Sequence, residues 1–206
     1  RAIYQTREFE ERFLKIGINY RIVGGIKFYE RAEVKDAIFY LRIINQKFDD
    51  LAFERIVNTP RRGIGEATIK QLYEFSSKSK ICLEDSVRKL IELNKIKPKT
   101  KYLMKHLLDL IAKWRSDLKK NKHYDLLKII LDESGYSAML KNKKDLENEN
   151  RLENLKELLR AMHDYDNLQG FLEHVALATS IDQEWDDEKV NMMTMHAAKG
   201  LEFNSV

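Results

Sequence analysis

The sequence is poor in cysteine, proline and glycine. One cysteine, two prolines and eight glycines are spread over 206 residues. The single cysteine, Cys82, excludes an internal disulfide framework and suits a reducing compartment, so we expect a cytoplasmic protein. The chain also lacks a Cys/His cluster with metal-ligand spacing, and we therefore predict no metal site.

Long apolar runs are missing as well. No stretch approaches the roughly 18 residues that cross a bilayer, and no secretory signal opens the chain, so we expect no membrane partner. Hydrophobic residues still make up 43% of the sequence and charged residues 34%, which suffices for a core and a solvated surface. The length suits one generous domain or two small ones, and we expect a monomer. Because the chain starts at Arg1 without a methionine and stops at Val206, we interpret it as a fragment of a longer protein.

The overall charge adds only a weak hint. The chain has 37 basic and 33 acidic side chains and a net charge of +4, which is compatible with a polyanionic partner. Many of the lysines sit among isoleucine and asparagine, a bias that A+T-rich coding alone can produce. The local placement of charge therefore counts for more than its sum.

Hydrophobic periodicity predicts helices along most of the chain. Residues 3–16 and 32–45 carry apolar side chains at helical spacing, with a strand at 20–23 and a second extended piece at 26–28 between them. Further helices are expected from residue 49, after residue 65, and over 100–119, 126–131, 150–165 and 168–179, with a helix end near Gly135. The polar run 141–150 predicts a solvated loop.

Several helices have apolar faces that a structure can test. Residues 3–16 have Phe9, Phe13 and Ile16 as the apolar positions of a short amphipathic helix. The other expected inner faces are Leu51, Phe53, Ile56 and Val57; then Ile69, Leu72, Tyr73 and Phe75; then Leu103, Leu107, Ile111, Trp114 and Leu118.

The end of the chain differs in character from its middle. Residues 182–189 form an acidic join, 190–195 (VNMMTM) predict a buried strand, and the following HAAKGLEF begins like a helix. The fold that we predict is therefore mainly α, with a helical module inserted between two pieces of an α/β domain. Those pieces are too short to complete a sheet alone.

Residues 194–203 (TMHAAKGLEF) follow the last expected strand, where open α/β sheets bind ligands. Thr194 and His196 could donate hydrogen bonds to a phosphate, and Glu202 could accept them from a sugar hydroxyl. Gly200 would let the backbone approach a ligand closely. Any corner between a strand and a helix contains residues of these types, so a ligand site and an ordinary corner both stay open.

Residues 58–68 (NTPRRGIGEAT) gather turn residues between two amphipathic helices. Gly63 and Gly65 permit positive φ and remove side-chain bulk, so backbone N–H groups can face outward. Gly65 also leads into a helix N-terminus, which favours a phosphate. The candidate DNA contacts are Thr59, Arg61, Arg62, Gly63, Ile64, Gly65 and Thr68, with Ile64 turned inward as a peg. The alternative is a tight turn with solvated arginines.

The stretch TMHAAKGLEF resembles motif V of the UvrD/PcrA/Rep group of superfamily 1 DNA helicases. Further segments look like the same family in the same order: Gln5-Thr6-Arg7 with Glu10-Glu11, then residues 17–42, then residues 49–65. The resemblance implies that residues 1–33 and 189–206 are pieces of the second RecA-like domain, 2A. Residues 34–188 would be the helical subdomain 2B, inserted into 2A, with a helix-hairpin-helix around residues 58–68.

The resemblance also implies functional roles. Glu202 would contact the nucleotide ribose, and Gly200 would shape the loop that couples the nucleotide to DNA. Thr194 and His196 would lie near the translocating single strand, while subdomain 2B would bind the duplex backbone. The parent would be a 3′-to-5′ DNA helicase that uses ATP and Mg²⁺, works in DNA repair or replication and meets partner proteins there.

The chain itself has no G-x-x-x-x-G-K-[ST] P-loop and no Walker-B acidic pair. We therefore expect no catalytic residue, no bound ATP or Mg²⁺ and no ATP hydrolysis from this chain alone. Two other classes of function stay open: a non-enzymatic helix-hairpin-helix DNA-binding module, and a protein-interaction domain whose DNA binding is incidental. Salt-dependent duplex binding would distinguish the helicase and the DNA-binding module from the interaction domain.

Overall fold

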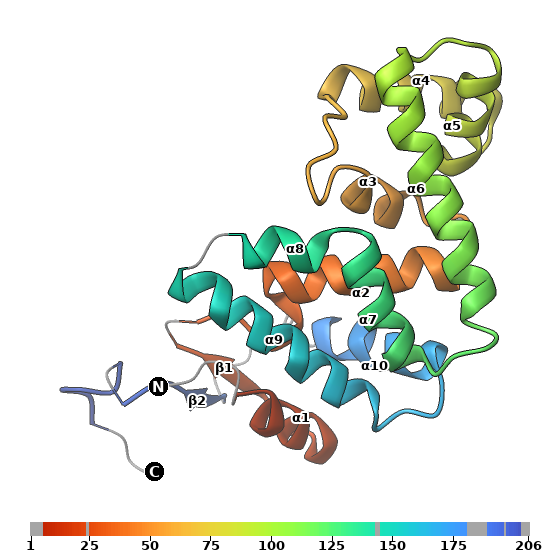
Figure 1. Ribbon diagram of the computed structural model, residues 1–206. Helices are drawn as coiled ribbons and strands as arrows, with labels where there is room; N and C mark the ends of the chain where they lie inside the picture. The colour runs from red at the N-terminus through yellow and green to blue at the C-terminus, as the bar shows by residue number, and fades with distance from the viewer. Residues whose placement is uncertain (1–5, 24, 143–144, 181–188, 196, 203–206) are drawn as a thin grey trace.

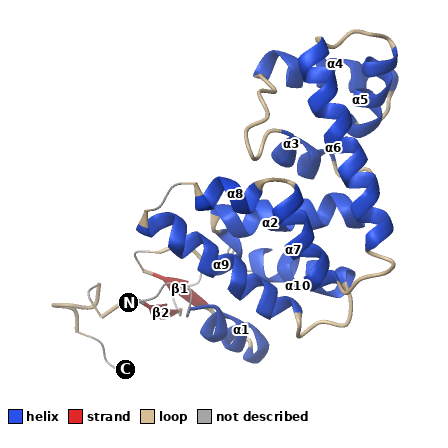
Figure 2. Cartoon of the chain, viewed as in Figure 1, coloured by secondary structure: helices blue, strands red, loops and turns tan. Residues whose placement is uncertain are grey.

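The computed structural model describes residues 6–23, 25–142, 145–180, 189–195 and 197–202 (Figure 1). Helices dominate them, so the prediction of a mainly α fold is confirmed (Figure 2). In chain order the elements are α1 (Thr6–Ile16), β1 (Tyr20–Ile22), η2 (Phe28–Glu30), α2 (Ala32–Asn45), α3 (Asp50–Val57), α4 (Glu66–Ser79), α5 (Leu83–Glu92), α6 (Pro98–Asp117), α7 (His123–Glu133), α8 (Tyr136–Lys141), α9 (Leu146–Met162), α10 (Leu168–Ser180) and β2 (Val190–Met192). No described helix is both long enough and apolar enough to cross a membrane.

The two short strands come from opposite ends of the chain. They pair in parallel, with Tyr20 opposite Val190 and Ile22 opposite Met192. All helices from α2 to α10 lie between them in the sequence. The strands predicted at these two places are confirmed, although β2 ends at Met192 and does not reach Met195. The expected burial of the second strand is wrong, since Val190 is exposed and Met192 is only half-buried.

The second extended piece, predicted at residues 26–28, does not form a strand. Phe28–Glu30 form a 3-10 turn, η2. The Phe28 amide donates a hydrogen bond to Glu10 Oε2 at 3.0 Å, so its donor is used by α1 and not by a neighbouring strand. Phe28 is fully buried, so its apolar side chain serves the core from a turn and not from a strand.

Helix α1 is built differently from a simple amphipathic helix. Phe9 is 62% exposed and Ile16 is exposed as well, whereas Arg7, Glu10 and Glu11 are buried. The apolar face predicted for this helix is therefore wrong at Phe9 and Ile16. Charge can be buried here because each buried group of α1 has a partner of opposite charge or a hydrogen-bond donor.

The partners of α1 lie on η2 and on helices α9 and α10. Arg7 Nε lies 2.7 Å from Glu157 Oε1 on α9. Glu11 accepts a hydrogen bond from the Tyr29 hydroxyl at 2.6 Å, and its other oxygen lies 2.9 Å from His174 Nε2. Burial raises the pKa of Glu11, but His174, Tyr29 and Arg7 lower it by more, so the pKa lies below its ordinary value. Polar contacts thus tie α1 to α9 and α10.

Helix α2 is the centre of the helical part and contacts α3, α6, α7, α9 and α10. Its Tyr40 ring meets Trp114 of α6 edge-on, with the ring centroids 5.9 Å apart. Trp114 is fully buried, and its indole N–H donates to Glu133 at 2.8 Å. Core packing, the default expectation for a tryptophan within an apolar stripe, is confirmed.

The apolar faces predicted for α3, α4 and α6 are confirmed in large part. Phe53, Ile56, Val57, Leu72, Leu107, Ile111 and Trp114 are buried, and Ile69, Phe75, Leu103 and Leu118 are half-buried. The prediction is wrong for Leu51 and Tyr73, whose side chains are 59% and 40% exposed. Successive residues of a helix are about 100° apart, so Ala52, next to Phe53, takes the inward position that was assigned to Leu51. Tyr73 stays at the surface and donates to Glu54.

The loop predicted at residues 141–150 is too long. Helix α9 begins already at Leu146, because Asp145 caps it by accepting a hydrogen bond from the Asn148 amide at 2.7 Å. The helix end expected near Gly135 is confirmed, since α7 ends at Glu133 and Gly135 has a φ of +81°. The acidic join at 182–189 lies almost wholly outside the described residues.

A buried ion pair fixes the outer helices to the centre. Glu84 of α5 is 1% exposed, and its two oxygens lie 2.9 and 2.7 Å from the two terminal nitrogens of Arg115 on α6. Arg115 also donates to the Ile43 carbonyl of α2 at 2.8 Å. Burial raises the pKa of Glu84, but Arg115 and Arg88 outweigh burial and lower it overall. This contact holds α5 and α6, and with them α4, in place over α2.

Candidate nucleic-acid interface

The glycine-bearing corner of residues 58–65 joins α3 to α4 in the upper part of the molecule, and we call it the α3–α4 corner (Figure 1). Ile64 is 2% exposed, so the expectation that it points inward is confirmed. Gly63 has a φ of +71°, a conformation that glycine adopts without strain. Gly65 has an ordinary φ of −81° and forms the N-cap of α4. The buried Ile64 therefore separates two glycines that are both exposed.

The Asn58 side chain stabilises the backbone of the corner. Its side-chain oxygen accepts hydrogen bonds from the Arg62 amide at 2.8 Å and from the Ile64 amide at 3.4 Å. Two backbone donors of the loop are thereby used internally, as in turns that asparagine side chains stabilise. Sequence reasoning missed this residue, although an asparagine at the start of a glycine-bearing turn is the signal that could have found it.

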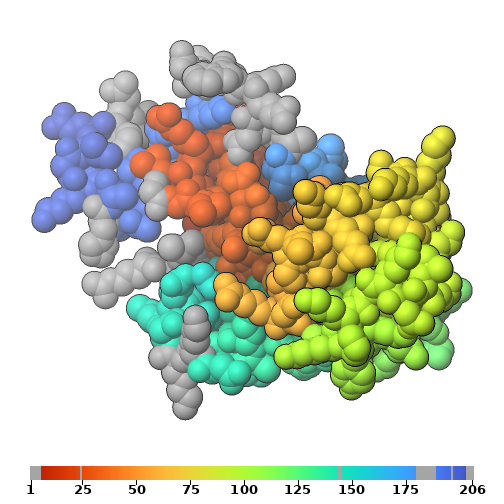
Figure 3. Space-filling model, turned by 90° about the horizontal axis from the view of Figure 1, so that it is seen from above, coloured from red at the N-terminus to blue at the C-terminus, as the bar shows by residue number. Residues whose placement is uncertain are grey.

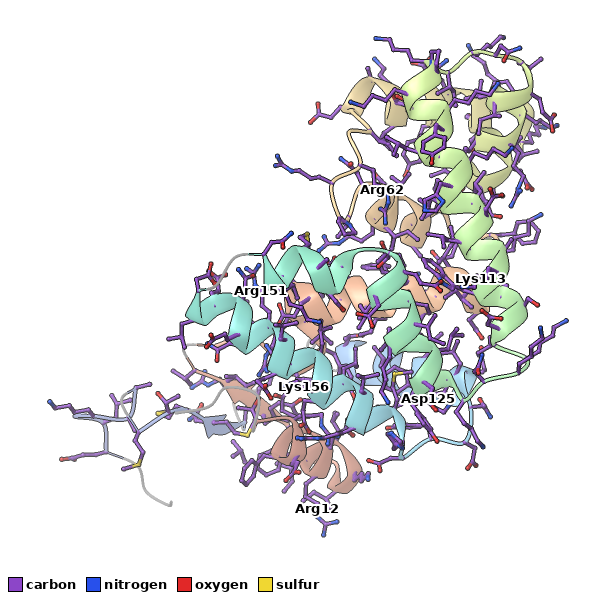
Figure 4. All side chains as sticks on the ribbon, viewed as in Figure 1. Arg12, Arg62, Lys113, Asp125, Arg151 and Lys156 are labelled. Atoms are coloured by element: carbon purple, nitrogen blue, oxygen red, sulfur yellow. The ribbon has the colours of Figure 1, made fainter. Side chains whose placement is uncertain are left out.

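Arg62 points back into the protein. Its guanidinium donates to carbonyls at the end of α3 and in the corner, at 2.8 Å to Ile56 and at 3.2–3.3 Å to Val57, Thr59 and Pro60. It also donates to the Tyr40 hydroxyl at 2.9 Å and to the Ser134 carbonyl at 3.3 Å. Figure 4 shows Arg62 between the corner and α3. This side chain shapes the corner, and its contact with DNA stays a prediction that these hydrogen bonds do not favour.

Other donors of the corner face outward. The backbone N–H groups of Gly63, Gly65, Glu66 and Ala67 make no hydrogen bond within the described part of the chain. The N-cap of α4 has no side-chain oxygen to satisfy these donors. Arg61 is exposed beside them, and Thr59 and Thr68 are half-buried. Among the described residues, the corner and the first turn of α4 thus present unsatisfied N–H groups beside the exposed Arg61, which together suit an anion.

The glycines leave room for a ligand. A Cβ atom placed on Gly65 would meet no other atom of the described chain within 4 Å, and the same holds for Gly63. At Gly63 the positive φ explains the glycine. At Gly65 neither the backbone conformation nor the surrounding space requires one, so the missing side chain leaves the amides open to something outside the chain.

A shallow hollow of about 480 Å³ lies on the other side of the corner, between α3 and α4. It is lined by Glu54, Val57, Asn58, Ile64, Glu66, Ile69, Lys70 and Tyr73. Tyr73 donates to Glu54, and partial burial followed by that hydrogen bond raises the pKa of Tyr73 to about 12. Because Glu54 and Glu66 both face this hollow, it does not suit a phosphate, and the Arg61 side of the corner is the better anion surface.

The C-terminal motif forms a turn after β2. Thr194 Oγ1 accepts a hydrogen bond from the Ala197 amide at 3.2 Å, and the Thr194 carbonyl accepts one from Ala198 at 3.0 Å. Gly200 has a φ of +85°. The residues described after β2 form turns and no helix, so the helix expected from HAAKGLEF does not begin before residue 203.

The structure places the predicted site residues in two groups. Thr194, Gly200 and Glu202 are exposed on the same short turn, and His196 lies outside the described residues. The α3–α4 corner lies at the other end of the molecule (Figure 1). No group of His, Cys, Asp and Glu side chains that could hold a metal ion is found among the described residues.

Comparisons with known proteins match the whole chain. A family model described as "UvrD-like helicase C-terminal domain" matches residues 1–206. A probable DNA helicase II homolog from Rickettsia felis is 37% identical over 208 residues, which cover 100% of this chain and 32% of that protein. The ATP-dependent DNA helicase PcrA of Staphylococcus aureus is 33% identical over 207 residues, which cover 97% of this chain and 28% of that protein. The chain thus spans about a third of the length of the curated relatives that it matches.

Proposed function

Because the chain belongs to the UvrD-like helicase C-terminal domain family, we propose that it forms the DNA-gripping part of an ATP-dependent DNA helicase. Residues 1–33 and 189–206 are then pieces of the RecA-like domain 2A, and residues 34–188 are the inserted subdomain 2B. The parallel pairing of β1 with β2 supports this division, since strands separated by the helical module share one small sheet.

The α3–α4 corner acts in this proposal as a helix-hairpin-helix that binds the duplex backbone. One observation carries it: the amides of Gly63, Gly65, Glu66 and Ala67 are unsatisfied at an exposed corner beside Arg61. Backbone N–H groups at a helix N-terminus bind phosphate oxygens, and the helix dipole adds to the attraction. Gly65 lets the phosphate approach these donors, and Arg62 with Asn58 keeps the corner in shape.

Such a grip should not depend on base sequence. None of the donors at the corner is placed to read base edges, and phosphate contacts position a protein without specifying a sequence. Each phosphate that is neutralised should contribute about 0.9 to the slope of log K against log salt. Binding should therefore be salt-sensitive and equal for unrelated sequences.

The turn after β2 belongs, in this proposal, to the ATP-hydrolysing part of the parent protein. Thr194 and His196 would contact the single strand, and Gly200 with Glu202 would contact the nucleotide held with Mg²⁺ between the RecA-like domains. The exposure of Thr194, Gly200 and Glu202 supports this, because all three are accessible to a ligand. The P-loop and the metal ligands must come from outside this chain, so the chain alone hydrolyses no ATP. The 3′-to-5′ polarity and a role in repair or replication complete the proposal.

A charge reversal tests the duplex grip. Arg61→Glu should weaken binding of a blunt duplex roughly tenfold or more at 0.1 M salt, since one lost phosphate contact alone costs about eightfold there. Arg12→Glu is the matched control: Arg12 is an exposed arginine on α1, far from the corner (Figure 4). Fluorescence anisotropy with two unrelated duplex sequences would measure both. Equal losses for the two variants would show that only net charge matters and would refute the grip.

A further inference from the structure

A lysine-rich stretch next to the α3–α4 corner has no assigned role. Residues 93–108 (LNKIKPKTKYLMKHLL) contain five lysines and no acidic residue, in a chain with 33 acidic residues among 206. Four of them alternate along the chain, and we call Lys95, Lys97, Lys99 and Lys101 the lysine strip. Coding bias explains lysine in general, but it does not explain why the acidic residues are missing here.

The structure turns the strip outward. It runs from the loop after α5 into the first turn of α6, and Ile96, at 7% exposed, is its inward anchor. Lys95, Lys97 and Lys99 are exposed, and Lys101 is half-buried. Because Ile96 is fixed in the core, the lysines on either side of it are held at the surface in a defined place.

No carboxylate of the described residues pairs with a lysine of the strip. Lys95, Lys97, Lys99 and Lys101 form no ion pair within the described part of the chain, unlike Lys47, Lys113, Lys128 and Lys156. Lys101 donates instead to the neutral Asn94 side chain at 2.8 Å. The first turn of α6 contains no acidic residue either, although acidic side chains are the ones that stabilise a helix N-terminus. Four positive charges thus lie close together along the chain without a carboxylate partner among the described residues.

The strip adjoins the corner. The Gln71 side chain, in the second turn of α4, donates to the Lys95 carbonyl at 3.1 Å, so the loop that carries the strip lies against the helix that the corner begins. Figure 3 shows the gold surface of the start of α4 next to the yellow-green surface of this loop and the start of α6. The loop that carries the strip is therefore a neighbour of the helix that the corner begins.

We propose that the lysine strip is a second contact surface for the duplex backbone, which extends the grip of the α3–α4 corner along the DNA. This inference rests on the proposed function of the corner. Duplex DNA carries about one negative charge per 1.7 Å of its axis, so a duplex held at the corner brings further phosphates over an adjacent surface. Flexible lysine side chains follow a backbone without reading its sequence, which matches a grip that moves along DNA.

The test removes the charge of the strip in the 206-residue chain. The variant Lys95→Gln, Lys97→Gln, Lys99→Gln loses three exposed cations, while Lys101, which bonds Asn94, stays. The matched control is Lys119→Gln, Lys120→Gln, Lys122→Gln, which loses three exposed lysines beyond the other end of α6. The 20 residues of α6 separate the two groups by about 30 Å. Anisotropy with a blunt duplex, measured from low to moderate salt, gives the affinity and its salt slope.

We expect the strip variant to bind roughly 100-fold or more weakly at 0.1 M salt, with a slope smaller by about 2 to 3, because each lost contact contributes about 0.9. The control should change affinity less than about threefold, through net charge alone. If strip and control variants behave alike while Arg61→Glu still weakens binding, the strip proposal is wrong and the corner stands. If only the strip variant weakens binding, the corner proposal is wrong. If an acidic protein ligand binds the strip and the duplex does not, both are wrong.

Discussion

Replacing Arg62 should damage the fold, whereas replacing Arg61 should damage DNA binding. The two arginines are neighbours, but within the described part of the chain only the Arg62 side chain makes hydrogen bonds, the shortest to the Ile56 carbonyl at 2.8 Å and the Tyr40 hydroxyl at 2.9 Å. A hydrogen bond from a charged donor contributes about 1.5–3 kcal/mol, so the two short bonds give about 3–6 kcal/mol. Arg62 is only half-buried, and solvent screening brings the expected loss for Arg62→Ala to about 3 kcal/mol.

Urea unfolding followed by circular dichroism measures this loss. With a slope of about 3 kcal/mol per molar urea for a chain of this size, the midpoint of Arg62→Ala should fall by about 1 M. Arg61→Ala should stay within about 0.5 kcal/mol of the wild type, as exposed side chains usually do. Arg62→Lys keeps the charge but not the planar fork, so it should recover little.

The comparison can refute the structural reasoning clearly. If Arg62→Ala unfolds at the same urea concentration as the wild type, the guanidinium does not hold the corner. If Arg62→Lys restores full stability, charge alone is sufficient and the bonds to several carbonyls are not needed. In either case Arg62 would return to the set of direct DNA contacts.

Three further predictions concern stability. Gly63→Ala should cost about 1–2 kcal/mol in urea unfolding, because its φ of +71° strains any other residue although the site has space; no loss would mean that the corner adjusts. Glu84→Gln should cost about 3 kcal/mol, the low end of the range for a broken buried pair, because it leaves the half-buried Arg115 without its charge partner; a loss below 1 kcal/mol would mean that the pair is dispensable. Since Glu11 and Glu84 have pKa values below the ordinary 4.5, the stability that they contribute is present above that pH and is lost as the pH falls through their folded-state values. Urea midpoints from pH 7 to 3 should fall steeply at the acid end for the wild type and less steeply for Glu11→Gln; equal slopes would contradict the reasoning.

The helices of the core could be predicted from the sequence because their burial follows a local period. Leu107, Ile111 and Trp114 recur at the spacing of one helix face, and the face is buried as that spacing requires. Helix α1 breaks the rule because its burial is decided by distant partners. Glu157 and His174, which make burial of Arg7 and Glu11 possible, lie more than a hundred positions further along the chain, and no local pattern contains them.

The position of the candidate site could be predicted from the sequence, but the hydrogen bonds of its side chains could not. Two glycines around an apolar residue indicated a tight corner with an inward side chain, and Ile64 confirms the inward side chain. The different fates of Arg61 and Arg62 could not be read from the sequence, because adjacent loop residues point in directions that only the folded carbonyls define. The lysines of the strip can be seen in the sequence, but their position beside α4 depends on the contact between Gln71 and Lys95.

The central claim, that duplex phosphates sit on the amides of the α3–α4 corner, is tested most directly by Gly65→Val. A Cβ at this position meets no other atom of the described residues within 4 Å, and a φ of −81° with a ψ of 165° suits valine. Because valine is a poorer N-cap than glycine, the melting temperature should fall by about 2–4 °C, the effect of about 1 kcal/mol, and the variant should stay folded. The branched side chain would cover the amides, and duplex affinity at 0.1 M salt should fall by roughly tenfold, the loss of about one phosphate contact. A folded variant with wild-type affinity for the duplex would contradict the account.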